Sequence, residues 1–142
     1  MQKRSDENGD AWIRNVAMNG PPGRDVPDGL YAEISREMVH LYKEQFGRGP
    51  VKARTRFAGP DCLVCTLEAS LTAADHALVA LGEERHLRDT RMFSQYAKEE
   101  KFLEVVERLC QRRVRAFVSG IDIRRDVSAE VFYLEGEAAE SI

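Results

Sequence analysis

The sequence contains no apolar run long enough to cross a membrane. Its longest uninterrupted apolar stretch covers only 77–81, whereas a transmembrane helix needs about 20 such residues. The first residues carry Lys3 and Arg4 but then Asp6, Glu7 and Asp10, without the apolar centre of a secretory signal. These absences predict a cytoplasmic protein that does not insert directly into a membrane.

The sequence also lacks an excess of positive charge. The chain has 21 Lys and Arg residues against 24 Asp and Glu residues, which gives a net charge of −3 and a pI near 5.7. No overall positive field therefore exists to draw the molecule onto nucleic acid. Aromatic residues, which stack on unpaired bases, do not occur among the arginines of 48–56. We expect no nucleic-acid partner.

Cysteine is scarce and odd in number, with only Cys62, Cys65 and Cys110. In a chain without an export signal this pattern indicates reduced thiols rather than disulfides. The two-residue gap between Cys62 and Cys65 suits a metal or redox pair, but residues three apart on a strand point to opposite faces. We therefore predict packed cysteines and no metal or cofactor.

Catalytic signatures are sparse as well. His40, His76 and His86 match no metal-ligand spacing and have no neighbouring nucleophile turn. Glu68 is the only carboxylate at the end of a predicted core strand, which is weak grounds for acid or base catalysis. No catalytic residue is predicted.

The chain does contain a clear amphipathic helix, which begins at Asp28. Large apolar residues recur there at helical spacing and charged residues occupy the other side. Asp28 is a suitable N-terminal cap and Gly47 a suitable stop. The apolar stripe consists of Leu30, Ile34, Met38, Leu41 and Tyr42.

A strand pattern follows directly from Val51 to Phe57. Apolar or small residues alternate there with Lys52, Arg54 and Arg56, so an extended chain places the basic side chains away from the core. Residues 58–61 have turn chemistry, and 62–67 reads as the returning strand of a β-hairpin.

Further along, Thr72 and Asp75 form a capping-box pattern that opens a short helix ended by Gly82. Residues 84–112 lack both Gly and Pro and predict one long helix, or two with a bend near Lys98. A second hairpin is expected from strands at 114–119, where Val114, Ala116 and Val118 alternate with other residues, and at 127–134. The segment 120–126 reads as its loop.

This order predicts an α+β fold, a two-layer sandwich in which a four-stranded antiparallel sheet carries its helices on one face. We expect one domain at 28–135, a flexible leader at 1–27 that contains Pro21 and Pro22, and an acidic tail at 136–142. The other sheet face needs cover, so we predict a homodimer that packs across part of that face or across a sheet edge.

The junction Gly47-Arg48-Gly49-Pro50 carries the most concentrated chemistry. Phosphate-binding loops precede a helix, whereas this turn follows one. Two interpretations remain open: a helix stop beside a solvated basic face, or a site for a small anion or an acidic partner. In the second interpretation, the binding site consists of Arg48, Lys52, Arg54 and Arg56. Arg112, Arg113 and Arg115 would extend it if the two hairpins lie side by side.

Several stretches together resemble the MpsC-like family over about residues 28–135. The helix and its Gly-Arg-Gly-Pro junction are the most distinctive part of the resemblance. The stretches, in order, are 34–39, 41–55, 63–68, 71–72, 91–93, 112–117 and 131–135. The family takes its name from a soluble component of a sodium-translocating, membrane-potential-generating system linked to inorganic carbon uptake, whose other parts include membrane proteins.

The resemblance implies a non-catalytic accessory or regulatory domain whose partner is a membrane protein of that system, peripheral to the membrane through that partner. Its ligand at the basic surface would be the partner itself or a small anion such as bicarbonate. The alternative is an enzyme acting on an anionic small molecule, with the arginines holding the substrate and Glu68 or a histidine as the base.

Overall fold

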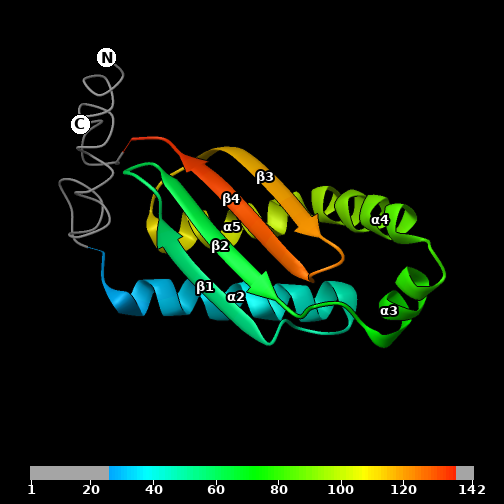
Figure 1. The fold of residues 1–142 in the computed structure, drawn as a ribbon. Helices are drawn as coiled ribbons and strands as arrows, with labels where there is room; N and C mark the ends of the chain where they lie inside the picture. Colours follow the sequence, from blue (N-terminus) through cyan, green and yellow to red (C-terminus); the bar gives the residue numbers. More distant parts are fainter. Residues whose placement is uncertain (1–25, 137–142) are drawn as a thin grey trace, which may run out of the picture.

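The computed structural model describes residues 26–136 (Figure 1). Most of the predicted leader and nearly all of the predicted tail lie outside this range. The helices and strands follow the predicted order. They are α2 (Asp28–Phe46), β1 (Lys52–Phe57), β2 (Cys62–Glu68), α3 (Ala73–Ala80), α4 (Glu84–Ala97), α5 (Glu99–Cys110), β3 (Val114–Asp122) and β4 (Val127–Leu134).

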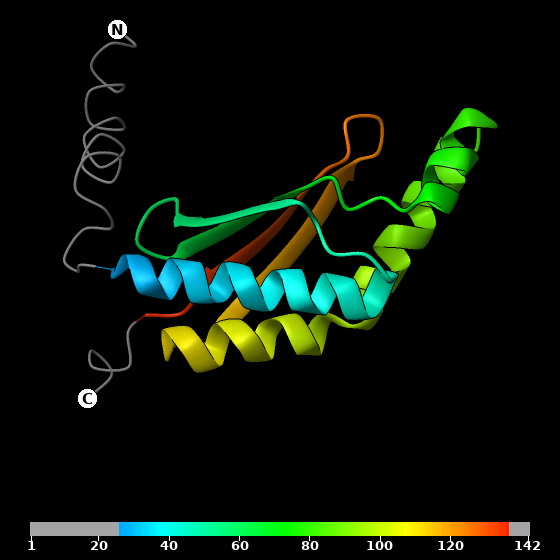
Figure 2. The same cartoon turned by 90° about the horizontal axis from the view of Figure 1, so that it is seen from below.

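The strands form one antiparallel sheet in the order β1-β2-β4-β3. Helices α2 and α5 lie side by side against one face of it, as Figure 2 shows. Both hairpins therefore join a single sheet through the pairing of β2 with β4. The predicted α+β fold, with a four-stranded antiparallel sheet and this order of elements, is confirmed.

Helix α2 ends where the sequence indicated. Gly47 adopts the left-handed conformation with φ 83°, and its amide donates to the carbonyl of Lys43 at 2.9 Å, an arrangement that glycine reaches without steric cost. At the other end the expected cap is wrong by one residue, because Pro27 occupies the N-cap position and Asp28 begins the helix. The Asp28 carboxylate instead lies in the first turn, where it interacts favourably with the helix dipole.

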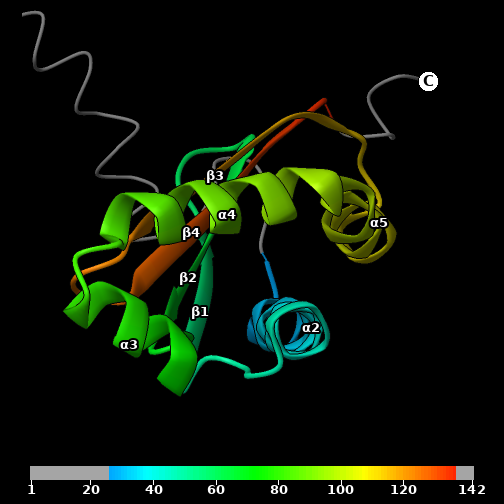
Figure 3. The ribbon, with the colours of Figure 1, turned by 90° about the vertical axis from the view of Figure 1, so that its right-hand side faces the viewer.

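The segment 84–112 forms two helices rather than one. Helix α4 ends at Ala97 and α5 begins at Glu99, with Lys98 between them. In Figure 3, α2 and α5 are seen end-on while α4 is seen from the side, so the chain turns sharply at Lys98. The predicted bend is present, and it lets α5 pack against α2. Helix α4 instead contacts β3, where the Tyr96 hydroxyl forms hydrogen bonds with the backbone of Ser119.

The capping box at the start of α3 is present in both directions. The Asp75 amide donates to the Thr72 hydroxyl at 3.1 Å, and the Thr72 amide donates to the Asp75 carboxylate at 2.9 Å. Two free amides of the first turn are thereby satisfied. Asp75 thus replaces the usual glutamate of this motif.

Strand β3 differs from the prediction in two respects. It continues to Asp122, because Gly120 pairs with Ala129 and Asp122 with Val127, so part of the expected loop is strand. A register shift between Val114 and Ala116 also changes which side chains face the helices. Ser119 is buried, whereas Val118 is 51% exposed on the other face.

The main core lies between the sheet and the α2–α5 layer. It is built from the α2 stripe and from the helix-facing side chains of the central strands, including Leu63, Leu67 and Phe132. A smaller cluster, formed by Leu71, Leu87 and Ile123, joins the α3–α4 region to the end of the sheet. No helix within residues 26–136 is long and apolar enough to span a membrane.

Candidate functional site

The basic side chains of β1 lie where the alternation predicted. Lys52, Arg54 and Arg56 are exposed, while Thr55 and Phe57, which alternate with them, are buried. Strand β1 is an edge of the sheet. Alternation directs its basic residues to the sheet face opposite the helices, although the Arg56 side chain reaches over the edge to Tyr31 of α2. We call these three residues the basic row.

The members of the basic row differ in their contacts. Lys52 pairs with Glu68 across the ladder, so an opposite charge lies beside it. The Arg56 guanidinium lies 4.8 Å from the ring centroid of Tyr31 and donates to the carbonyl of Thr55 at 2.6 Å. Arg54 faces Thr66 and has no ion pair within residues 26–136. Arg54 is therefore the member most available to an outside ligand.

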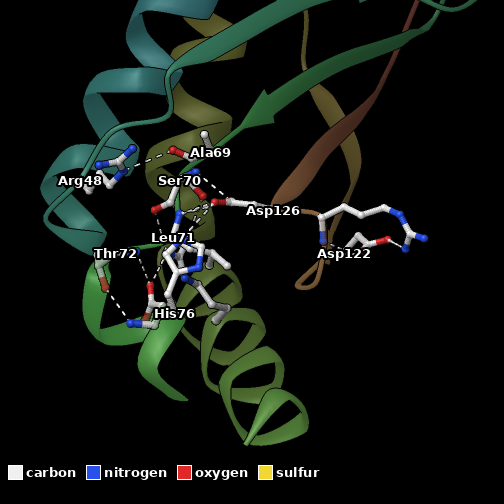
Figure 4. A network of polar contacts seen from close by, with 11 residues as sticks. Arg48, Ala69, Ser70, Leu71, Thr72, His76, Asp122 and Asp126 are labelled. Atoms are coloured by element: carbon white, nitrogen blue, oxygen red, sulfur yellow. Dashed lines mark hydrogen bonds and ion pairs between the residues drawn. The ribbon is translucent and has the colours of Figure 1, made fainter. Parts of the chain in front are cut away.

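Arg48 contacts a different part of the molecule. Its Nε atom donates to the carbonyl of Ala69 at 3.3 Å, in the loop between β2 and α3 (Figure 4). Ala69 has φ 61°, a conformation that costs energy for a residue with a side chain. Arg48 thus helps to hold a strained loop, which accounts for an arginine between two glycines. The hydrogen bond of Arg48 is thus directed to the β2–α3 loop and not to the basic row.

Asp126 holds the same loop from the other side. Its carbonyl accepts the Ala69 amide at 2.9 Å, and its carboxylate accepts the amides of Ser70 and Leu71 at 2.8 and 3.1 Å. His76 lies 3.9 Å from that carboxylate. Figure 4 shows these side chains converging on residues 69–72 from the α2–β1 turn, the β3–β4 turn and α3.

The second hairpin does not extend the basic row. Strand β3 is at the far edge of the sheet, separated from β1 by β2 and β4. Arg112 is buried and donates to the carbonyls of Glu135 and Pro60 at 2.9 and 3.0 Å, so it has a structural role. Arg115 pairs with Asp61 at 3.5 Å. The two hairpins lie side by side through β2 and β4, but β1 and β3 are at opposite edges, so the arginines of β3 do not lie beside the basic row.

Between the two edges, the uncovered sheet face carries a group of apolar side chains beside the polar residues Thr66 and Glu68 of β2. Val64, Val131 and Val118 lie side by side across β2, β4 and β3. Val118 is 51% exposed and Val127 is 37% exposed, while the others are partly exposed. We call this set of four valines the valine strip. The open face thus combines an apolar centre with the basic row along one edge.

The residues considered for catalysis do not gather at the basic row. Glu68 is partly exposed beside Lys52, His40 pairs with Glu44 at 3.2 Å, and His76 lies at the loop that Asp126 holds. Within the described range, no hydrogen bond or ion pair connects any histidine with Arg54. The geometry offers Glu68 as a neighbour of Lys52 and gives it no second catalytic group.

None of the three cysteines, all of which lie among the described residues, forms a disulfide. Cys65 faces the core and is buried, whereas its neighbour in the pattern, Cys62, is only partly buried, as expected for opposite faces of a strand. Burial raises the pKa of the Cys65 thiol to about 12. The thiolate form that metals and disulfide exchange require is therefore strongly disfavoured there.

A buried ion pair anchors α4. Arg91, only 4% exposed, donates to the Asp75 carboxylate at 2.9 Å and to the carbonyl of Ser70 at 3.1 Å. Its guanidinium lies 3.8 Å from the ring centroid of Phe46. Burial opposes ionisation of Asp75, but the hydrogen bond from Thr72 and the contact with Arg91 outweigh it and lower the pKa of that carboxyl.

A second buried polar cluster was not found from the sequence. Glu130 is fully buried on the face of β4 that packs against the helices. Its carboxyl accepts hydrogen bonds from the hydroxyl of Tyr42 and, at 2.8 Å, from the amide of Gln95. Burial raises the pKa of Glu130 to about 7. The sequence did indicate that Glu130 is buried, because alternation along the strand from Ser128 places it on the same face as Phe132 and Leu134.

Comparison with protein families decides the relationship of the chain. A family model described as "Na+-translocating membrane potential-generating system (MpsC)" matches residues 28–136. The chain belongs to the MpsC family. The match covers the whole sheet and every described helix, and it confirms the resemblance that the sequence shows over about residues 28–135. No curated protein and no solved structure matches the chain.

Proposed function

We propose that this MpsC-family protein is a non-catalytic accessory subunit that binds a protein partner through the open face of its sheet. The partner belongs to the ion-translocating membrane system after which the family is named. The chain works on the cytoplasmic side and reaches the membrane through that partner.

One observation carries this proposal: the basic row lies beside the valine strip on a sheet face that no described helix covers. Burying partly exposed valines stabilises a complex by about 25 cal/mol per Å² of apolar surface. Lys52 and Arg54 at the edge select a partner with acidic side chains at the matching rim. An apolar centre with a charged rim is the usual composition of a protein interface.

Charge reversal tests the proposal against a matched control. The test variant carries Lys52→Glu, Arg54→Glu and Arg56→Glu. The control variant carries Arg36→Glu, Lys43→Glu and Arg85→Glu, three exposed positions on α2 and α4 that change the net charge equally. Each tagged protein is added to detergent-solubilised membranes of the producing cell, and the co-purifying membrane proteins are quantified.

The expected result is that wild type and control retain the same membrane protein, whereas the test variant loses about 90% of it, an approximately tenfold loss that corresponds to about 1.4 kcal/mol. Equal retention by both variants would contradict a role for the basic row. Loss in both would show that only overall charge matters.

A further inference from the structure

Glu130 connects its own strand to four other elements of the fold. It lies on β4, with Ser119 of β3 on one side of the ladder and Cys65 of β2 on the other. Tyr42 of α2 and Gln95 of α4 donate to it from the helix layer. All five residues are buried. A change in the protonation of this carboxyl therefore affects contacts in both the sheet and the helix layer.

If the Glu130 carboxyl is ionised, the buried oxygen atoms around it have too few hydrogen-bond donors. Its Oε2 atom accepts both donors. Its Oε1 atom, the Gln95 Oε1 atom and the Ser119 hydroxyl are buried and form no hydrogen bond of good geometry among the described residues, although the Ser119 hydroxyl lies close enough to Glu130 to favour its ionised form. With a carboxylate, these three oxygens share a single hydrogen, that of Ser119. Buried polar atoms without partners are strongly unfavourable, so a missing hydrogen is indicated.

The surrounding charges do not neutralise Glu130 either. Tyr42, Cys65 and Arg91 are the other ionisable groups that the neighbouring elements place near this cluster. Arg91, the one cation among them, pairs with Asp75 at 2.9 Å. Tyr42 and Cys65 are neutral near pH 7, because burial raises the pKa of both groups. An ionised Glu130 would therefore be a buried anion without a counter-charge, which is strongly unfavourable.

We propose that Glu130 is a proton-binding site that makes the packing of the sheet against α2 and α4 respond to pH. In the fully packed fold the carboxyl is protonated and supplies the missing hydrogen from Oε1. As the pH rises through neutrality the proton leaves to bulk water. The hydrogen bonds from Tyr42 and Gln95 favour the resulting anion, but the loss of its hydration outweighs them, so the packed fold loses stability. The value of about 7 to which burial raises the pKa of Glu130 agrees with this.

The sign of the effect follows from linkage. An unfolded glutamate titrates near pH 4.3, whereas the folded one holds its proton to about pH 7. The stabilising contribution of the bound proton is thus complete below the unfolded value and disappears as the pH rises to the folded value. Across that interval the unfolding constant increases by up to about tenfold per pH unit.

The test uses the full chain and two single variants, Glu130→Gln and Glu100→Gln. Glutamine imitates the protonated acid at Glu130, while Glu100 is an exposed position on α5 that loses the same charge. Carboxyl carbon NMR between about pH 4 and 9 follows each glutamate across its titration. We expect one glutamate to titrate near pH 7 in the wild type and in Glu100→Gln, and that signal to be absent in Glu130→Gln.

Urea unfolding gives the second readout. The ratio of the wild-type unfolding constant to that of Glu130→Gln should rise steeply between about pH 5 and 7, while the ratio to Glu100→Gln should not. If Glu130→Gln does not fold, the wild-type NMR titration still decides the matter. Titration of all glutamates below about pH 5.5 would overturn the proposal.

A salt comparison separates a proton from a metal ion. The NMR titration is repeated with choline chloride replacing sodium chloride at the same ionic strength. A midpoint unchanged by the exchange supports a proton site. A midpoint that falls in sodium would show that a bound cation neutralises the carboxylate, and the proton assignment would be wrong.

Discussion

Arg91 and Asp75 form an ion pair with an N–O distance of 2.9 Å, and the two side chains are 4% and 17% exposed. The pair joins the start of α3 to the middle of α4. Arg91 also donates to the loop carbonyl of Ser70, so one guanidinium fixes the capping residue, the loop and the α4 helix together.

Removing Arg91 should therefore destabilise the fold strongly. Arg91→Ala leaves Asp75 without its cation, and losing one partner of a buried pair costs about 3 to 5 kcal/mol; we expect the lower end, about 3 kcal/mol, since Asp75 is partly exposed. Urea unfolding measures the change. Arg88→Ala is the control, because Arg88 is exposed and lies 3.8 Å from Glu84, and its loss should cost under about 1 kcal/mol.

The same pair predicts the acid limb of the stability profile. The folded pKa of Asp75 is lowered by its contacts with Thr72 and Arg91 against the effect of burial. Its contribution is complete above the unfolded value of about 3.9 and is lost as the pH falls through the folded value. Asp75→Asn should be less stable than the wild type at about pH 6, and the difference should shrink below about pH 4. A constant difference across this range would contradict the assignment.

Two glycines of α2 and its C-cap form a matched test of backbone conformation. Gly47 has φ 83° and open space where the methyl group of an alanine would lie, and Gly29, in the first turn, has equally open space. Gly47→Ala should destabilise by about 1 kcal/mol, because only the left-handed conformation opposes it. Gly29→Ala should stabilise by up to about 1 kcal/mol through helix propensity. Thermal unfolding of both variants measures the difference.

The hypothesis that the basic row binds a small anion, which the sequence left open, makes a separate prediction. Bicarbonate, phosphate and adenine nucleotides are titrated while the melting temperature is followed. If an anion binds at the basic row, the temperature rises with its concentration, and Arg54→Ala removes that rise. Arg48→Ala should lower the starting temperature through the loss of its bond to Ala69 yet keep the rise. If no anion changes the melting temperature, the small-anion hypothesis is wrong.

Self-association across the open face predicts a solution mass of twice 16.1 kDa, measurable by light scattering after gel filtration. Val118→Asp places a charge within the valine strip and should give the monomer mass. Val51→Asp is the control, because Val51 is 76% exposed and precedes β1. A dimer that survives Val118→Asp must use a sheet edge instead, and a wild-type monomer would contradict self-association altogether.

The sequence by itself determined the local elements. Periodicity of 3.6 along α2, alternation along β1, the Thr72 and Asp75 cap and the left-handed Gly47 are decided within a few neighbouring residues. The basic row could be placed on the outer face for the same reason. The position of Glu130 was also implied by alternation, although a single polar residue in a strand does not reveal its partners.

Only the tertiary structure decided which distant side chains meet. The pairing of β2 with β4 separates the arginines of the two hairpins and brings Ser119, Glu130 and Cys65 into one line. The bend at Lys98 sets the direction of α4, whose Gln95 reaches the same carboxyl, and the turn between α3 and α4 brings Arg91 to Asp75. These contacts join residues far apart in the chain, and they depend on strand order and helix packing, which the burial of apolar surface from the whole chain selects.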